Sequence, residues 1–201
     1  MKTYLTIIKY LQTITLSLGV VLLIVLPSIL TLAPDLIETS LLFAVAHTTL
    51  FLVMAIRPLA DLLPQFRFIR PLVILRKGVG VLSASIVVSF IISKLIMDAG
   101  GYFENFFSLS YWSVISLAFF AHSADVAAVI LLVTSNNLSK KILGANWKRV
   151  QKLAYVYFYA SGIYVFGMFG DTLVLSYMVA VTVLTTLAYF SNKQRDLLKT
   201  A

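Results

Sequence analysis

Three side chains in this 201-residue sequence place a chemically active group in an apolar setting: His47, His122 and Asp125. Each lies inside a long run of hydrophobic residues, where an ionisable group is costly and by default indicates function. His122 and Asp125 are three residues apart in "FFAHSADVAAV", so a helix would place them on one face. Counted from the ends of their runs, the two histidines lie at a similar depth, and two helices could bring them together.

Three interpretations of this trio stay open. In the first, His47 and His122 are the axial ligands of one b-type haem, and Asp125 accepts a hydrogen bond from a ligand imidazole. In the second, the three residues form a proton path with Asp125 as a relay. In the third, they bond one another or nearby Ser and Thr side chains and only fix helix packing. The sequence has two histidines and no cysteine, so these are the only imidazole ligands for haem iron, and thiolate ligation is excluded.

The elements that must position these residues are expected to be transmembrane helices. The sequence is 60% hydrophobic and 12% charged, whereas soluble domains are about half apolar and about a quarter charged. Six apolar runs are each long enough to cross a hydrocarbon core of about 30 Å, and lipid excludes open sheet edges. The predicted helices span about residues 5–32, 36–56, 73–97, 111–134, 150–169 and 173–190. We therefore predict an all-α fold: one domain over residues 1–201, an integral bundle of six transmembrane helices in the cell membrane.

The basic residues predict the orientation of this bundle. If both termini share one side of the membrane, that side holds nearly all of them: Lys2, Lys9, Arg57, Arg67, Arg70, Arg76, Lys77, Lys140, Lys141, Lys148, Arg149, Lys152, Lys193, Arg195 and Lys199. Only Lys94 lies near the other side, where its stem can snorkel. The positive-inside rule then predicts that both termini are cytoplasmic. The net charge of +8 is explained by this topology, so nucleic acid is not an expected partner, whereas the lipid bilayer is.

Three segments resemble a known family. The stretch "TSNNLSKKILGANWKRVQKLAYVYFYASGIYVFG" leads from an inner connection into the fifth predicted helix, "RPLADLL" follows the second, and "LRKGVGVLS" begins the third. Together they resemble the ferric reductase-like transmembrane superfamily, in particular its six-helix haem-binding membrane subunits of the methionine sulfoxide reductase system. In the longest segment the matching residues are Thr134, Ser135, Lys140, Lys141, Leu143, Gly144, Trp147, Lys148, Lys152, Leu153 and Tyr155. The resemblance covers about residues 36–190.

This resemblance implies electron transfer across the membrane through b-type haem, with electrons from a quinol or a cytoplasmic flavin donor. In the family, histidines on the third and fifth helices hold the iron. The matching positions here are Phe90, Gln151 and Tyr164. Phenylalanine has no lone pair, a glutamine amide is a poor iron ligand, and tyrosine ligation strongly favours ferric iron. The haem positions of the family are therefore degenerate in this chain.

The functional expectation follows from both arguments. It is a ferric reductase-like membrane subunit that transfers electrons through haem b held by His47 and His122, together with a redox partner protein or a quinone. The alternative is a haem-free structural or regulatory membrane protein that retains the fold, and a third is a proton-coupled transporter or channel. The tyrosines at positions 155, 157, 159 and 164 offer one more alternative, a polar cavity for a quinone or lipid. We expect no flavin or nicotinamide domain and no catalytic residue, so the chain is at most an electron-transfer subunit of an oxidoreductase.

Overall fold

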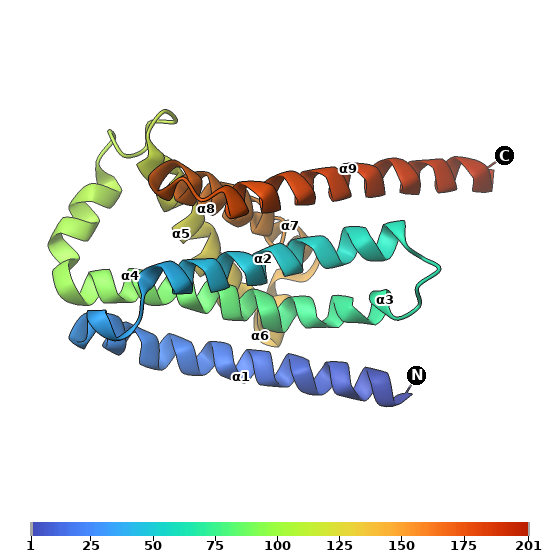
Figure 1. Cartoon of the computed structure of the whole chain (residues 1–201), viewed down its shortest axis with the longest axis horizontal. Coiled ribbons are helices and arrows are strands. Elements are labelled where there is room, and N and C mark those ends of the chain that lie inside the picture. The colour runs from blue at the N-terminus through green and yellow to red at the C-terminus, as the bar shows by residue number, and fades with distance from the viewer. Residues whose placement is uncertain (1, 201) are drawn as a thin grey trace.

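The computed structural model describes residues 2–200, with side chains for residues 2–198, and every regular element in this range is a helix (Figure 1). The long helices are α1 (Lys2–Leu32), α2 (Thr39–Leu62), α4 (Arg76–Phe107), α5 (Leu117–Thr134), α8 (Leu153–Phe169) and α9 (Thr172–Thr200). The predicted all-α fold is confirmed over this range.

Five segments are long and apolar enough to cross a membrane. They are α1, α2, the continuous segment Ile69–Phe107, α5 and the Thr172–Leu198 part of α9. The remaining apolar helix, α8, has 17 residues and falls below the length that defines these five. At 1.5 Å per residue it extends only about 25 Å, a little less than the hydrocarbon core. The described residues thus support a membrane-embedded helical bundle with five helices long and apolar enough to span, and the sixth predicted span stays a prediction.

Short helices connect the long ones. They are η1 (Pro34–Leu36), α3 (Ile69–Leu72), η2 (Val73–Leu75), α6 (Asn137–Leu143), η3 (Gly144–Asn146) and α7 (Trp147–Val150). The side chain of Asn136 caps α6 by accepting a bond from the Ser139 N–H at 2.7 Å. Gly170 ends α8 in the left-handed conformation at φ 66°, which glycine adopts without strain, and the Asp171 carboxylate then accepts from the Leu173 N–H at the start of α9.

The structure corrects the prediction at both ends of the connection between the third and fourth predicted helices. Helix α4 does not stop near residue 97 but continues to Phe107 across a kink at Asp98, whose φ of −153° and ψ of 81° are not helical. The Asp98 carboxylate accepts a bond from the Gly101 N–H at 2.9 Å, so it caps the second part of the helix. The next helix begins at Leu117 and not at residue 111, because the Ser116 hydroxyl caps it by accepting from the Ala118 N–H.

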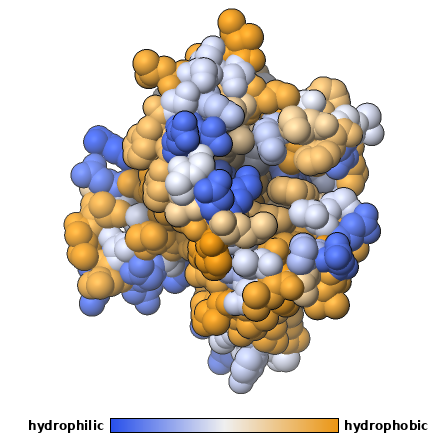
Figure 2. Space-filling model, turned by 90° about the vertical axis from the view of Figure 1, so that its left-hand side faces the viewer, coloured by the Kyte–Doolittle hydropathy of each residue, from blue (hydrophilic) through white to orange (hydrophobic). Residues whose placement is uncertain are grey.

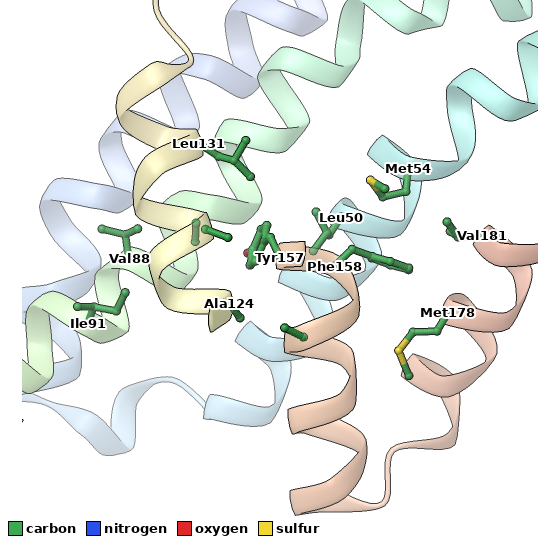
Figure 3. Close-up of a cluster of buried hydrophobic side chains, with 13 residues drawn as sticks. Leu50, Met54, Val88, Ile91, Ala124, Leu131, Tyr157, Phe158, Met178 and Val181 are labelled. Atoms are coloured by element: carbon green, nitrogen blue, oxygen red, sulfur yellow. The ribbon is translucent and has the colours of Figure 1, made fainter. Parts of the chain in front are cut away.

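Helix α4 is the central helix of the bundle. It packs against α1, α2 and α5, while α8 packs against α2, α5 and α9. The main core cluster joins five helices (Figure 3) and comprises Leu50, Met54, Val88, Ile91, Ala124, Ala127, Ala128, Leu131, Tyr157, Phe158, Ala160, Met178 and Val181. Three alanines on α5 let this helix approach its neighbours closely, as small residues do in membrane bundles.

The outer surface of the bundle is apolar where a bilayer would surround it. Large hydrophobic side chains on α1 and α9 are exposed, for example Ile24 at 69% and Val179 at 57%. Both chain ends lie at the same end of the molecule (Figure 1). Figure 2 views the opposite end, where hydrophobic side chains cover much of the flanks and hydrophilic ones form separate patches between them. The exposed apolar flanks of the bundle are suited to contact with lipid rather than with water.

Candidate functional site

His47 lies on α2 and is almost completely buried, with 3% of its surface exposed. Its Nδ1 atom donates a bond to the Phe43 carbonyl oxygen one turn earlier, at 2.8 Å. The backbone carbonyl of Ser161, on α8, lies near the same ring. Within the described residues, Nε2 has no hydrogen-bond partner. His47 is therefore a packed residue of the α2–α8 interface with one unused ring nitrogen.

His122 lies on α5 in a different environment. Three aromatic rings surround its ring: Phe106 on α4, and Tyr111 and Trp112 in the turns between α4 and α5. Their centroids lie 5.3, 5.8 and 5.7 Å from that of His122. Both ring nitrogens are buried without a hydrogen-bond partner in the described part of the chain. The neighbours of the two histidines therefore differ. His47 lies beside Phe43 and Ser161, whereas His122 lies among the three aromatic rings.

Asp125 lines a cavity of about 250 Å³ between α4 and α5. The other lining residues are Ile91, Tyr102, Phe103, Phe106, Val126, Val129 and Ile130. No hydrogen bond joins Asp125 to His122 in residues 2–198, although both belong to α5. The ammonium group of Lys94, on α4, interacts electrostatically with both side chains. Asp125 is thus the acidic member of a charged group that also includes Lys94, and not a hydrogen-bond acceptor for an imidazole.

Phe90, Gln151 and Tyr164, the positions predicted to match the haem ligands of the resembled family, take part in ordinary packing and hydrogen bonding. Phe90 stacks face to face on Phe43, with ring centroids 4.9 Å apart and planes within 2°. Gln151 follows α7, and its amide donates to the Thr134 hydroxyl at 3.5 Å. Tyr164 is partly buried on α8. None of these side chains presents an imidazole toward the bundle interior.

The tyrosines of α8 do not share one polar cavity. The Tyr157 hydroxyl is buried and bonds the Ser83 hydroxyl at 3.1 Å, whereas that of Tyr159 bonds Thr182 on α9 at 2.7 Å. Tyr155 is 41% exposed. Neither the cavity at Asp125 nor a second one, lined by Tyr4 and residues 65–68, includes any of them. Neither of these two cavities is the tyrosine-lined quinone cavity that the sequence offered as an alternative, which stays a prediction.

The sequence did not reveal the cavity itself. Its aromatic walls come from residues 102–106, which were expected to be an outer loop but are helical beyond the Asp98 kink (Figure 1). The sequence predicts only that the stem of Lys94 snorkels, whereas in the structure the positive charge of Lys94 also acts on Asp125. The available signal was the Asp98–Gly101 spacing, which is that of a helix N-cap and its bonded amide.

Neither histidine lines either of the two cavities. Three imidazole nitrogens, one on His47 and two on His122, have no hydrogen-bond partner in the described residues, and each neutral ring has one nitrogen with a lone pair for a metal. The described residues also contain no group of three or more His, Asp or Glu side chains arranged to hold a metal ion. Comparison of the chain with protein-family models, with curated proteins and with solved structures gave no match.

Proposed function

We propose that this chain is a multi-pass protein of the cell membrane that keeps a ferric reductase-like bundle without the haem of that family, and that it acts as a structural or regulatory subunit. The observation that carries this proposal is the stack of Phe90 on Phe43, at 4.9 Å and 2°. A position where the family would present an iron ligand is used here for close aromatic packing between α4 and α2.

The chemistry of the remaining donors supports the same proposal. Gln151 bonds Thr134, and a phenol at position 164 would hold only ferric iron well. His47 uses one nitrogen for the Phe43 carbonyl and is packed against α8. His122 is enclosed by the aromatic rings of Phe106, Tyr111 and Trp112. A haem ligated by both histidines would need space beside two rings that are already packed against protein groups.

The test of this proposal restores the missing ligands. The double variant Phe90→His, Tyr164→His is expressed beside the wild type in a host with ample haem, and both are purified in detergent. We expect the double variant to acquire a haem Soret band and each single variant to acquire little, because a low-spin b haem needs two axial imidazoles. A wild type that carries haem, lost on His47→Ala, would overturn the proposal even if the double variant fails to fold.

A second candidate function is electron transfer through haem b held by His47 and His122, with a redox partner protein or a quinone. It is favoured by one specific observation, the three buried imidazole nitrogens that have no partner in the described structure. A buried nitrogen without a hydrogen-bond partner costs folding free energy, and a bound ligand would remove that cost. The two candidates differ in a single property, the haem content of the wild-type protein.

We further propose that α8 is a short sixth crossing and that both termini are cytoplasmic. This proposal is supported by the position of both chain ends at one end of the molecule (Figure 1), as expected for an even number of crossings. The basic residues gather in the connections and tails assigned to that end, as the positive-inside rule requires.

The absence of cysteine makes this topology directly testable. Ala145 lies in the connection between α5 and α8, Ser110 lies in the turns between α4 and α5, and both are exposed. We expect a membrane-impermeant maleimide to label Ser110→Cys in intact cells, and Ala145→Cys only after permeabilisation. Labelling of both variants in intact cells would contradict the proposed orientation.

A further inference from the structure

The cavity at Asp125 has the composition of a ligand site. It lies between α5 and the end of α4, occupies about 250 Å³, and its walls are apolar or aromatic except for the Asp125 carboxylate and the Tyr102 hydroxyl. Ligand sites in proteins are typically apolar hollows with a few well-placed polar groups, and this volume suits a small ligand. The cavity belongs neither to the degenerate family positions nor to the surroundings of His47.

The carboxylate in this cavity lacks a partner that neutralises it. Asp125 forms no hydrogen bond in the described structure, and Lys94 acts on it electrostatically without forming an ion pair. An unpaired carboxylate at membrane depth is expensive, because the apolar surroundings solvate the charge poorly. A cation that enters the cavity would relieve this cost.

The residues that line the Asp125 cavity and its opening indicate which kind of cation it could bind. Tyr102, Phe103 and Phe106 line one wall, and aromatic faces attract an ammonium group when water is excluded. On α5, Val126, Val129 and Ile130 line the cavity and are themselves 37, 38 and 36% exposed. These three residues lie on the lipid-facing surface of an apolar helix, so a ligand would enter from the bilayer rather than from water.

We propose that this cavity binds a small lipophilic amine. Its ammonium group bonds the Asp125 carboxylate, and its hydrocarbon part packs against Ile91, Phe103 and Phe106. A neutral lipid chain or a quinone would fill the same apolar walls but would not depend on the charge of Asp125. The proposal is independent of the haem question, since it uses neither histidine as a ligand.

Trp112 provides a local reporter for the test, because its ring lies 5.5 Å from that of Phe106 in the cavity wall. The chain has two tryptophans, so Trp147→Phe leaves Trp112 as the only one. This protein, in lipid nanodiscs, is titrated with 4-phenylbutylamine and, separately, with the neutral analogue 4-phenylbutanol. We expect a saturable change in Trp112 fluorescence with the amine and a clearly weaker response to the alcohol.

Charge variants decide whether Asp125 is responsible. Asp125→Asn should weaken amine binding at least about tenfold, as expected for loss of a charge-assisted bond, and should leave the alcohol response unchanged. Lys94→Gln should strengthen amine binding, because it removes the competing positive charge. Glu104→Gln is the matched control: Glu104 is exposed on the same part of α4, does not line the cavity, and should have no effect.

Three results would overturn the proposal. They are equal binding of amine and alcohol, unchanged amine binding in Asp125→Asn, and no saturable response to the amine in the wild type. The first identifies a neutral ligand site, such as one for a lipid chain. Thermal unfolding of Asp125→Asn serves as a folding check, and we expect this variant to be at least as stable as the wild type, since it removes an unpaired buried charge.

Discussion

At the scale of single residues, polar groups of the bundle interior are used to join helices. Ser83 on α4 donates to the Ala46 carbonyl on α2 at 2.9 Å and shares a bond with the Tyr157 hydroxyl of α8 at 3.1 Å. Ser83 is completely buried, and Tyr157 is 2% exposed. One serine therefore connects three helices at the centre of the core.

Tyr157→Phe tests this connection. The variant removes one interhelical bond and leaves the ring in place, so we expect a loss of about 1 kcal/mol in the free energy of unfolding. The measurement is reversible unfolding in mixed detergent micelles. Tyr155→Phe is the control, since Tyr155 is 41% exposed and its hydroxyl forms no hydrogen bond in residues 2–198. Equal stabilities of the two variants would show that the Tyr157 bond contributes nothing.

At the scale of elements, Gly78 is one of the glycines that allow the close contact of α1 with α4. A Cβ atom at Gly78 would collide with the Thr15 hydroxyl and lie 2.9 Å from the Gln12 carbonyl oxygen, both on α1. At Gly80, the nearest atom would be a Val53 methyl group at 3.8 Å, an ordinary contact. The two glycines lie two residues apart on one helix, but only the first needs to lack a side chain.

Gly78→Ala should therefore destabilise the protein by about 1–3 kcal/mol, the usual cost of overpacking. Gly80→Ala should be neutral or stabilising by up to about 1 kcal/mol, because alanine favours the helix. Thermal unfolding of both variants in the same detergent provides the comparison. If the two variants unfold at the same temperature, α1 does not pack on α4 as closely as described.

The Asp98 cap determines whether residues 99–107 form a helix. Asp98→Ala removes the acceptor of the Gly101 N–H, and loss of such a cap costs about 1 kcal/mol. We expect faster amide hydrogen exchange in residues 99–107 and little change in α5. Asp98→Asn, which keeps an acceptor oxygen, should preserve the slow exchange. Fast exchange in the wild type would contradict a stable helix beyond the kink.

The fold class and most spans could be predicted because hydrophobic runs of membrane length leave few alternatives to a helix. The end of α4 could not, because "DAGGYFENFF" contains paired glycines that indicate a loop, and only the Asp98 side chain restores the helix. Similarly, the start of α5 depends on the Ser116 cap and not on hydrophobicity. Local side-chain bonds decided these boundaries.

The sequence could predict which residues belong to the candidate site, but not which of them lie close together. His47, His122 and Asp125 were identified from polarity alone, but their neighbours depend on which helices pack together. Because α2 packs against α8 and α9, His47 faces Ser161, while the turns after α4 cover His122. Depth along a helix can be counted from a sequence, whereas direction around the bundle axis cannot.

For the whole molecule, we propose a shape that does not depend on a cofactor. The chain has an apolar bundle with a central α4, exposed hydrophobic flanks and both ends on one side (Figure 1, Figure 2). Its interior is filled by the core cluster of Figure 3 and by the Phe90–Phe43 stack. The proposed subunit therefore rests on a bundle whose stability comes from its own packing.

The haem content of the wild-type protein tests this claim most directly. The chain is produced in a haem-replete host, purified in mild detergent, and assayed by absorption spectroscopy before and after dithionite, with haem quantified per chain as the pyridine complex. We expect far less than one haem per chain and no reducible Soret band. One haem per chain, with a b-type reduced spectrum that disappears in both His47→Ala and His122→Ala, would contradict it.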